Sequence, residues 1–207
     1  MAEPSGSRRR FGGTDGNERL TGSTGAVLLI LLAIEGLTVI SLRSLLSLHI
    51  LVGVLLIPPV LLKIATTGYR FARYYLGDAE YVRKGPPRLF LRALGPVIVL
   101  SSVVLFATGI ALLFAGPGGG GLKGIHKLSF IVLFAAMGAH VLAHLRKVPF
   151  LTAADWRRRT RLPGSAVRRG LLVAALAGGI AFGAVAIAYD GPWVHRAHHH
   201  RFDDGGH

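Results

Sequence analysis

The chain has 207 residues, of which 51% are hydrophobic and 16% are charged, and its formal net charge is +14. It contains no cysteine, which excludes disulfide bonds, thiolate zinc sites, cysteine-ligated iron–sulfur clusters and covalent attachment of a prosthetic group through a C-x-x-C-H motif. The apolar residues fall in blocks long enough to cross a bilayer, which takes about 20 residues of helix. The composition therefore predicts a polytopic membrane protein.

Five apolar blocks are candidate spans, at roughly 24–42, 44–65, 94–115, 125–145 and 170–189. The fold class expected is an all-α integral membrane bundle, with four helices forming a core over 24–146 and a fifth helix beside it. The other segments expected are a disordered cytoplasmic tail over 1–23, a basic cytoplasmic loop over 147–169 and a His-rich extracytoplasmic tail over 190–207. The start SRRRF resembles the twin-arginine export pattern, but no small-residue cleavage site follows, so the first block is interpreted as a retained helix.

The basic residues alternate with the spans. Nineteen of the 24 precede span one, separate spans two and three, or separate spans four and five, and the opposite side holds Arg43, Lys123, Lys127, Arg196 and Arg201. The positive-inside bias then places the N-terminus in the cytoplasm and the C-terminus outside the cell membrane. The excess of basic residues is therefore interpreted as an orientation signal. These residues also favour contact with the lipid bilayer through its anionic headgroups. No nucleic-acid partner is expected.

The connections predict how the spans pack. A short turn around Ser41–Ser44 makes spans one and two antiparallel neighbours, and GPGGGGLKG is expected to be a flexible loop between spans three and four. The G-x-x-x-G pair Gly179 and Gly183 in span five suits close contact with another helix. Four tyrosines in the segment after span two are expected in the interfacial aromatic belt: Tyr69, Tyr74, Tyr75 and Tyr81.

Histidines interrupt two of the spans. His49 lies about six residues past the turn that starts span two, and His126 lies near the same membrane surface at the start of span four. His140 is about 21 Å further along span four and within about 40° of the same face, and His144 aligns with His126 after five full turns. Imidazoles are costly in hydrocarbon unless something binds them. The alternative is that His49 and His126 are interfacial residues bonded to backbone carbonyls or headgroups.

Glu35 is a carboxylate inside span one. Counted from the turn at Ser41–Ser44, it shares the level of His49. It is expected to accept the second imidazole N–H of His49, which would orient the ring and raise its basicity. The other interpretations are a proton relay at a quinol site, and a protonated or Arg43-paired carboxylate that only holds helices together.

Two imidazoles facing each other in a bundle, with a small residue such as Gly53 or Gly109 nearby, are what a b-type haem needs. The pattern H126-x13-H140 resembles the membrane b-type cytochromes, the family that includes the cytochrome b membrane subunits of oxidoreductases. The resemblance covers roughly residues 24–146. It implies an outer haem b ligated by His49 and His126. The further candidate cofactor-site residues are Glu35, Gly53, His140 and His144.

The sequence departs from this family at position 63, where the inner histidine of span two would stand and where the chain has Lys63. His140 and His144 therefore lack a histidine partner at their level. Three explanations compete: one haem only, a second site completed by lysine or another ligand, or a bend at Pro58–Pro59 that changes the register. One haem is favoured.

The function expected is electron transfer between a quinol, or another membrane donor, and a partner oxidoreductase. No nucleotide or flavin motif is visible, which favours an electron-transfer subunit over a self-contained enzyme. The alternative is a cofactor-free transporter or scaffold in which Glu35 and the histidines form a proton or cation path. The tail holds a weak metal-binding signal made of His195, His198, His199, His200 and His207.

Overall fold

The computed structural model describes residues 12–86, 89–144 and 162–193. The helices run in the order α2 (Gly13–Ile40), α3 (Leu46–Leu55), α4 (Ile57–Tyr75), α5 (Ala79–Arg83), α6 (Leu89–Ala115), the 3₁₀ turn η1 (Gly116–Gly118), α7 (Gly120–His144) and α9 (Ser165–Ile187). Within these ranges five helical segments are long and apolar enough to cross a membrane, α3 and α4 together making one of them. The predicted all-α, five-span membrane fold is therefore confirmed.

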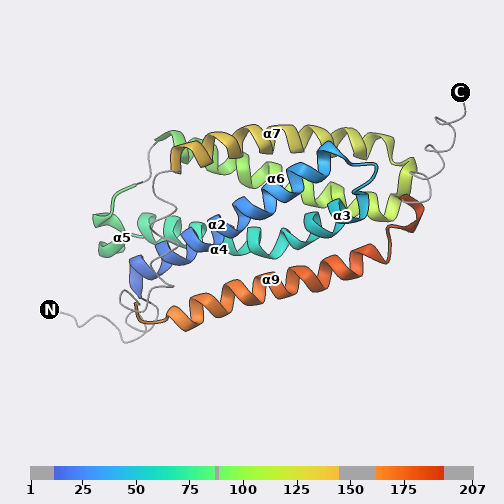
Figure 1. Ribbon diagram of the computed structural model, residues 1–207. Helices are drawn as coiled ribbons and strands as arrows, with labels where there is room; N and C mark the ends of the chain where they lie inside the picture. Colours follow the sequence, from blue (N-terminus) through green and yellow to red (C-terminus); the bar gives the residue numbers. More distant parts are fainter. Residues whose placement is uncertain (1–11, 87–88, 145–161, 194–207) are drawn as a thin grey trace, which may run out of the picture.

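The spans lie along one long axis (Figure 1). One end of the bundle, called here the histidine end, holds the α2–α3 turn, the α6–α7 turn and the end of α9. The opposite end, called the α5 end, holds α5 and the starts of α2 and α9. The predicted turn between spans one and two is confirmed, since the Ser44 and Leu45 amides donate to the Ser41 carbonyl at 3.1 and 3.0 Å.

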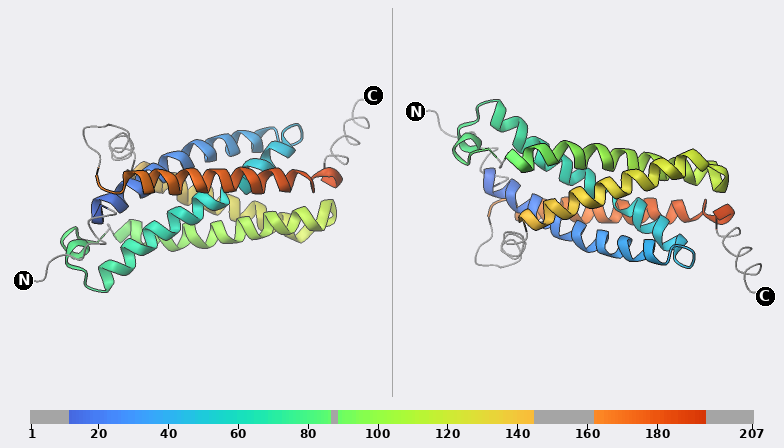
Figure 2. Two further views of the ribbon diagram at one scale, coloured as in Figure 1. Left: turned by 90° about the horizontal axis from the view of Figure 1, so that it is seen from below. Right: turned by 90° about the horizontal axis from the view of Figure 1, so that it is seen from above.

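The helices form two groups (Figure 2). In one group α9 packs along α3 and α4, while α2 packs along α4 and α3. In the other group α6 and α7 lie side by side over their length, and the two groups approach each other through α3 and α6. The seam between the groups is consequently bordered by α3, which carries His49, and by the α6–α7 pair, which carries His126.

Span two is broken at Leu56, between α3 and α4. Pro58 and Pro59 follow directly, and a proline has no N–H to donate to the carbonyl four residues earlier. The Leu55 carbonyl thus loses its usual helical donor. It lies against Gly179 of α9, where an added Cβ would be only 2.5 Å from the Leu55 oxygen. The break lies next to Pro58–Pro59, where a bend that changes the register is one of the three competing explanations for the missing inner histidine.

Glycines let α9 approach α3 closely. An added Cβ at Gly183 would lie 2.9 Å from the Leu51 carbonyl oxygen, one turn away from the Gly179 contact. Cα–H groups at such contacts donate weakly to carbonyls, which suits the Leu55 oxygen because the residue four positions later, Pro59, has no N–H to donate. The predicted role of the Gly179/Gly183 pair in helix packing is confirmed, with α3 as the partner.

The predicted disordered tail is wrong for residues 13–23, which are the first turns of α2. Their polar side chains have partners: the Asn17 amide donates to the Thr66 carbonyl at 3.1 Å, and Lys84 Nζ donates to Asp15 and Glu18 at 2.6 and 2.8 Å. Partial burial lowers the pKa of Lys84, but these two hydrogen bonds outweigh it and raise the pKa above its ordinary value. Contacts with α4 and the α5 segment thus order a stretch whose composition predicted disorder.

The GPGGGGLKG connection is a tight turn and not the flexible loop expected. Only Gly119 separates η1 from α7, and Lys123 Nζ donates to the Pro117 carbonyl at 2.5 Å. Trp193, which follows α9, makes two further contacts. Trp193 Nε1 donates to the Leu112 carbonyl at 3.1 Å, and Lys123 Nζ lies 5.1 Å from the centre of the Trp193 ring. These contacts hold the end of α9 to the α6–α7 pair at the histidine end.

The tyrosines after span two differ in their exposure. Tyr69 and Tyr75 are exposed, whereas Tyr81 is only 7% exposed and meets the Tyr69 ring edge-on at 6.1 Å. Burial raises the pKa of Tyr81. The prediction that Tyr81 belongs to an aromatic belt is wrong, because α5 folds back onto the bundle. Most of the predicted basic loop and most of the His-rich tail lie outside the described residues.

Candidate functional site

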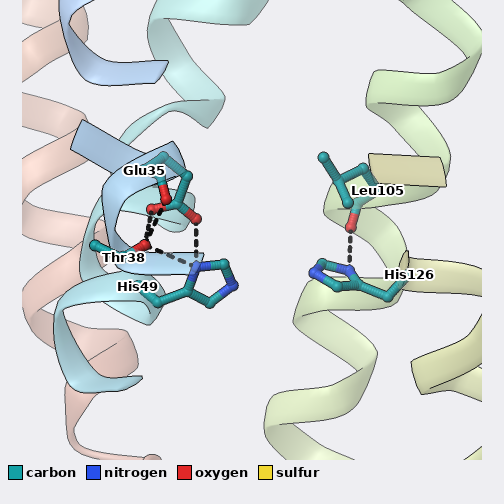
Figure 3. A network of polar contacts seen from close by, with 5 residues as sticks. All are labelled: Glu35, Thr38, His49, Leu105 and His126. Atoms are coloured by element: carbon teal, nitrogen blue, oxygen red, sulfur yellow. Dashed lines mark hydrogen bonds and ion pairs between the residues drawn. The ribbon is translucent and has the colours of Figure 1, made fainter. Parts of the chain in front are cut away.

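His49 and His126 point toward each other across the seam, the first from α3 and the second from α7 (Figure 3). Their ring centres are 6.4 Å apart and their planes stand at 87° to each other. Both side chains lie near the histidine end, so the prediction that the two imidazoles share a level is confirmed. Among the described residues, the hydrogen bonds and the ion pair of the two rings are all made through Nδ1.

On the α3 side, Glu35 fixes the His49 ring. Glu35 Oε1 lies 2.8 Å from His49 Nδ1, which confirms the predicted pairing. Thr38 Oγ1 also lies 3.1 Å from this nitrogen, while its hydroxyl donates to the Glu35 carbonyl at 2.6 Å. An ionised carboxylate only accepts, so beside an ionised Glu35 the proton is on His49 Nδ1. In the neutral form of this imidazole, Nε2 then has the lone pair.

On the α7 side, the partner of the His126 ring is a backbone group. His126 Nδ1 lies 3.1 Å from the Leu105 carbonyl oxygen of α6 and 3.1 Å from Thr108 Oγ1. The Thr108 hydroxyl donates to the Val104 carbonyl at 2.7 Å. Because a carbonyl only accepts, His126 Nδ1 is also the protonated nitrogen. His126 too has its lone pair on Nε2.

Each ring thus uses Nδ1–H to fix its orientation and turns an unprotonated Nε2 toward the other (Figure 3). Two lone pairs that face one another repel unless an electron-pair acceptor lies between them. Imidazole nitrogen is a common ligand of transition metals, and a hydrogen bond from its other nitrogen is the usual means of orienting it. The arrangement therefore places two imidazoles, a side-chain type that can bind metals, opposite each other across the seam.

Two glycines leave room for these side chains. An added Cβ at Gly53 would lie 3.3 Å from Glu35 Oε1, and one at Gly109 would lie 3.2 Å from His126 Cε1. Gly53, which was predicted to leave a gap for a flat cofactor, directly makes room for the carboxylate that holds His49. Gly109 does the same for the His126 ring.

At the other predicted level the residues do not form a matching pair. Lys63, at the position of the missing histidine, donates its Nζ to the Thr21 carbonyl of α2 at 2.7 Å and lies beside Gly25. His140 is partly exposed on α7, and His144 is the last residue of that helix. The lysine is therefore directed to α2, which leaves the prediction of a single site at His49 and His126 as the simpler one.

Three contributors to the site were missed by sequence reasoning. Thr38 has a signal, since it stands three residues after Glu35 and so on the same helix face. Thr108 is adjacent to Gly109, which the sequence did single out. The Leu105 carbonyl has no signal at all, because every residue carries one and only the packing of α6 against α7 selects it.

No family model, curated protein or solved structure matches the chain. The chemistry of the site is therefore inferred from its own contacts.

Proposed function

We propose that this protein is a membrane electron-transfer protein that binds haem b between His49 and His126. The observation that supports it is the pair of imidazoles, each oriented through Nδ1 and each turning an Nε2 lone pair toward the other. His49 and His126 would together hold the iron of a haem b bound between them. Bound there, it would supply one-electron redox chemistry, while the chain holds and orients the ligands within the membrane.

The spacing of the rings fits this ligand set. Metal–imidazole bonds are about 2.0–2.1 Å long, and the bonding nitrogen lies about 1.2 Å from the ring centre. Two imidazoles that held one metal ion from opposite sides would thus have their centres about 6.5 Å apart. The ring centres of His49 and His126 are 6.4 Å apart. The two rings would therefore not have to move closer together or further apart to bind one metal ion, as expected of a preorganised site.

His49 is oriented by the Glu35 carboxylate and His126 by a backbone carbonyl. The effect of the carboxylate on the haem potential can therefore be tested. We expect Glu35→Gln to raise the midpoint potential of the bound haem by about 50 mV, since a tenfold change in a one-electron equilibrium is 59 mV. The reason is that the carboxylate beside His49 Nδ1 makes this imidazole a stronger donor and stabilises the oxidised metal. A spectroelectrochemical titration of the purified protein measures the potential.

The matched control is Glu18→Gln, which removes the same charge at the α5 end, where Glu18 binds Lys84. This variant should leave the potential within experimental error of the wild type. Equal potentials for wild type and Glu35→Gln would contradict the role assigned to the carboxylate.

We also propose that the α5 end faces the cytoplasm and that the membrane is the cell membrane. The support is the distribution of basic residues along the sequence, since nineteen of the 24 precede span one, separate spans two and three, or separate spans four and five. Because the chain lacks cysteine, single-cysteine variants report topology without background. A membrane-impermeant maleimide should label Gly205→Cys on intact cells and Ser7→Cys only after permeabilisation. The reverse pattern would overturn this orientation.

The proposed haem lies at the histidine end, so electrons would be exchanged near the outer surface. A quinol or another membrane donor and a partner oxidoreductase are the proposed redox partners, in keeping with the resemblance to cytochrome b subunits. The second candidate is the cofactor-free proton or cation path, which the contact of Glu35 with His49 also suits. Haem content separates the two, because the second candidate requires none.

A further inference from the structure

A cavity lies at the α5 end, well away from the histidine pair. Its volume is about 400 Å³, within the range of small-molecule sites, which run from about 300 to 1,000 Å³. The start of α2, the end of α4, α5 and the start of α9 all contribute to its wall. The cavity therefore forms only when elements distant in sequence come together.

Charged groups of both signs line this cavity. Arg73 and Arg168 supply two guanidinium groups, and Asp78 and Glu80 supply two carboxylates. Arg73 Nη2 pairs with Asp78, and Arg168 donates to the Pro163 carbonyl at 2.8 Å while being only 5% exposed. Glu80 Oε2 lies beside the first turn of α2, 3.3 Å from where a Cβ of Gly13 would stand. The balanced charges suit a ligand that carries both signs.

One donor in the wall has no acceptor. Arg73 Nε is buried, and within the described part of the chain nothing lies within hydrogen-bond reach of it. A buried N–H left unpaired costs about 1–3 kcal/mol, so such a group calls for a partner. A phosphate oxygen is a strong acceptor for such a guanidinium N–H.

The remaining wall is apolar and belongs to membrane-spanning helices. Leu20 of α2 and Leu171 of α9 line the cavity, and both helices are long and apolar enough to cross a bilayer. A ligand whose polar part sits among the charged groups would thus have its remaining part beside hydrocarbon. This combination is that of a lipid entering from the adjacent leaflet.

We propose that this cavity binds the headgroup of a phospholipid that carries phosphoethanolamine. The phosphate takes the Arg73 Nε–H and the charge of Arg168, the ammonium lies near Glu80 and Asp78, and the acyl chains follow Leu20 and Leu171. This site does not depend on haem binding, because it shares no residue with the histidine pair. Its failure would leave the proposed electron-transfer function untouched.

The test is native mass spectrometry of the full chain in detergent, titrated with phosphatidylethanolamine, phosphatidylcholine and phosphatidylglycerol of identical acyl chains. We expect phosphatidylethanolamine to bind about tenfold more tightly than the other two, corresponding to one charged hydrogen bond. Phosphatidylcholine lacks ammonium N–H donors for the carboxylates, and phosphatidylglycerol lacks the positive charge. Equal affinity for all three lipids would overturn the proposal, as would a preference for phosphatidylglycerol.

Variants identify the groups responsible. Arg73→Gln should weaken phosphatidylethanolamine binding about tenfold. Glu80→Gln should instead reduce the preference for phosphatidylethanolamine over phosphatidylcholine. The control is Arg92→Gln, which removes a cation whose partner is the Tyr75 hydroxyl and which lies outside the cavity wall. Unchanged binding by both cavity variants would contradict the assignment.

A soluble headgroup is the other source of the same chemistry. O-phosphoethanolamine added at millimolar concentration should not displace the lipid, because the acyl chains along α2 and α9 contribute to binding. Displacement at equal concentrations of the two would contradict the assignment to a membrane lipid.

Discussion

Replacing either His49 or His126 with alanine is expected to abolish the haem absorbance of the purified protein. Each variant removes one of the two imidazoles that would hold the haem iron, and the surviving imidazole would have no partner across the seam to complete the ligand pair. Loss of an outer-shell partner alone typically costs about 10–100-fold in metal affinity, so loss of a ligand should cost more. Haem per chain, measured from the reduced spectrum and the protein concentration, gives the result.

Two control variants make this outcome interpretable. His195→Ala alters a histidine of the C-terminal tail and should retain the full absorbance. His140→Ala should also retain it if the single haem lies at the histidine end, since His140 is 14 residues along α7 from His126. Full absorbance in both ligand variants would refute the assignment of His49 and His126.

The second large effect is expected at the contact between α9 and α3. Gly179→Ala should lower the free energy of unfolding by about 1–3 kcal/mol, the usual cost of overpacking. The added methyl group would lie 2.5 Å from the Leu55 carbonyl oxygen, and a backbone atom cannot rotate away as a side chain can. The thermal unfolding midpoint of the detergent-purified protein measures the change.

The adjacent glycine supplies a matched control. An added Cβ at Gly178 meets nothing within 4 Å among the described residues, so Gly178→Ala introduces the same group into the same helix without a clash. Alanine is about 0.5–1 kcal/mol better than glycine inside a helix, and this variant should be neutral or slightly stabilised. Equal midpoints for Gly178→Ala and Gly179→Ala would mean that α9 does not pack on α3 as described.

This packing also bears on the candidate site. Leu51 and Leu55, which meet Gly183 and Gly179, follow His49 on the same short helix. A shift of α3 away from α9 would move the His49 ring relative to His126. We therefore expect Gly179→Ala to release haem at a lower temperature than Gly178→Ala does.

The lengths of the apolar blocks and the depth of individual residues within them made the central part of this fold predictable. The five apolar blocks gave the spans. Counting residues from the turn at Ser41–Ser44 placed Glu35 and His49 at one level, and the position of His126 at the start of span four placed it at a similar level. Such counting works because a transmembrane helix has a fixed rise and few alternatives within lipid. The contact of Glu35 with His49 at 2.8 Å follows from that regularity.

The wrong predictions concern segments whose structure depends on contacts distant in sequence. Residues 13–23 and Tyr81 lie outside the apolar blocks, where composition predicted disorder and an interfacial position. Their structure depends on partners far away in sequence, such as Lys84 for Asp15 and Glu18. The Leu105 carbonyl was likewise out of reach, since a backbone acceptor is selected by helix packing and leaves no residue-type signal.

The most direct test of the central claim is a dithionite-reduced minus air-oxidised absorbance spectrum of the protein purified from haem-replete cells, with haem quantified per chain. We predict sharp reduced α and Soret bands at one haem per chain. Two haems per chain would show that a second site exists near His140 despite the lysine at position 63. A colourless protein would contradict the cytochrome assignment and favour the cofactor-free path through Glu35 and the histidines.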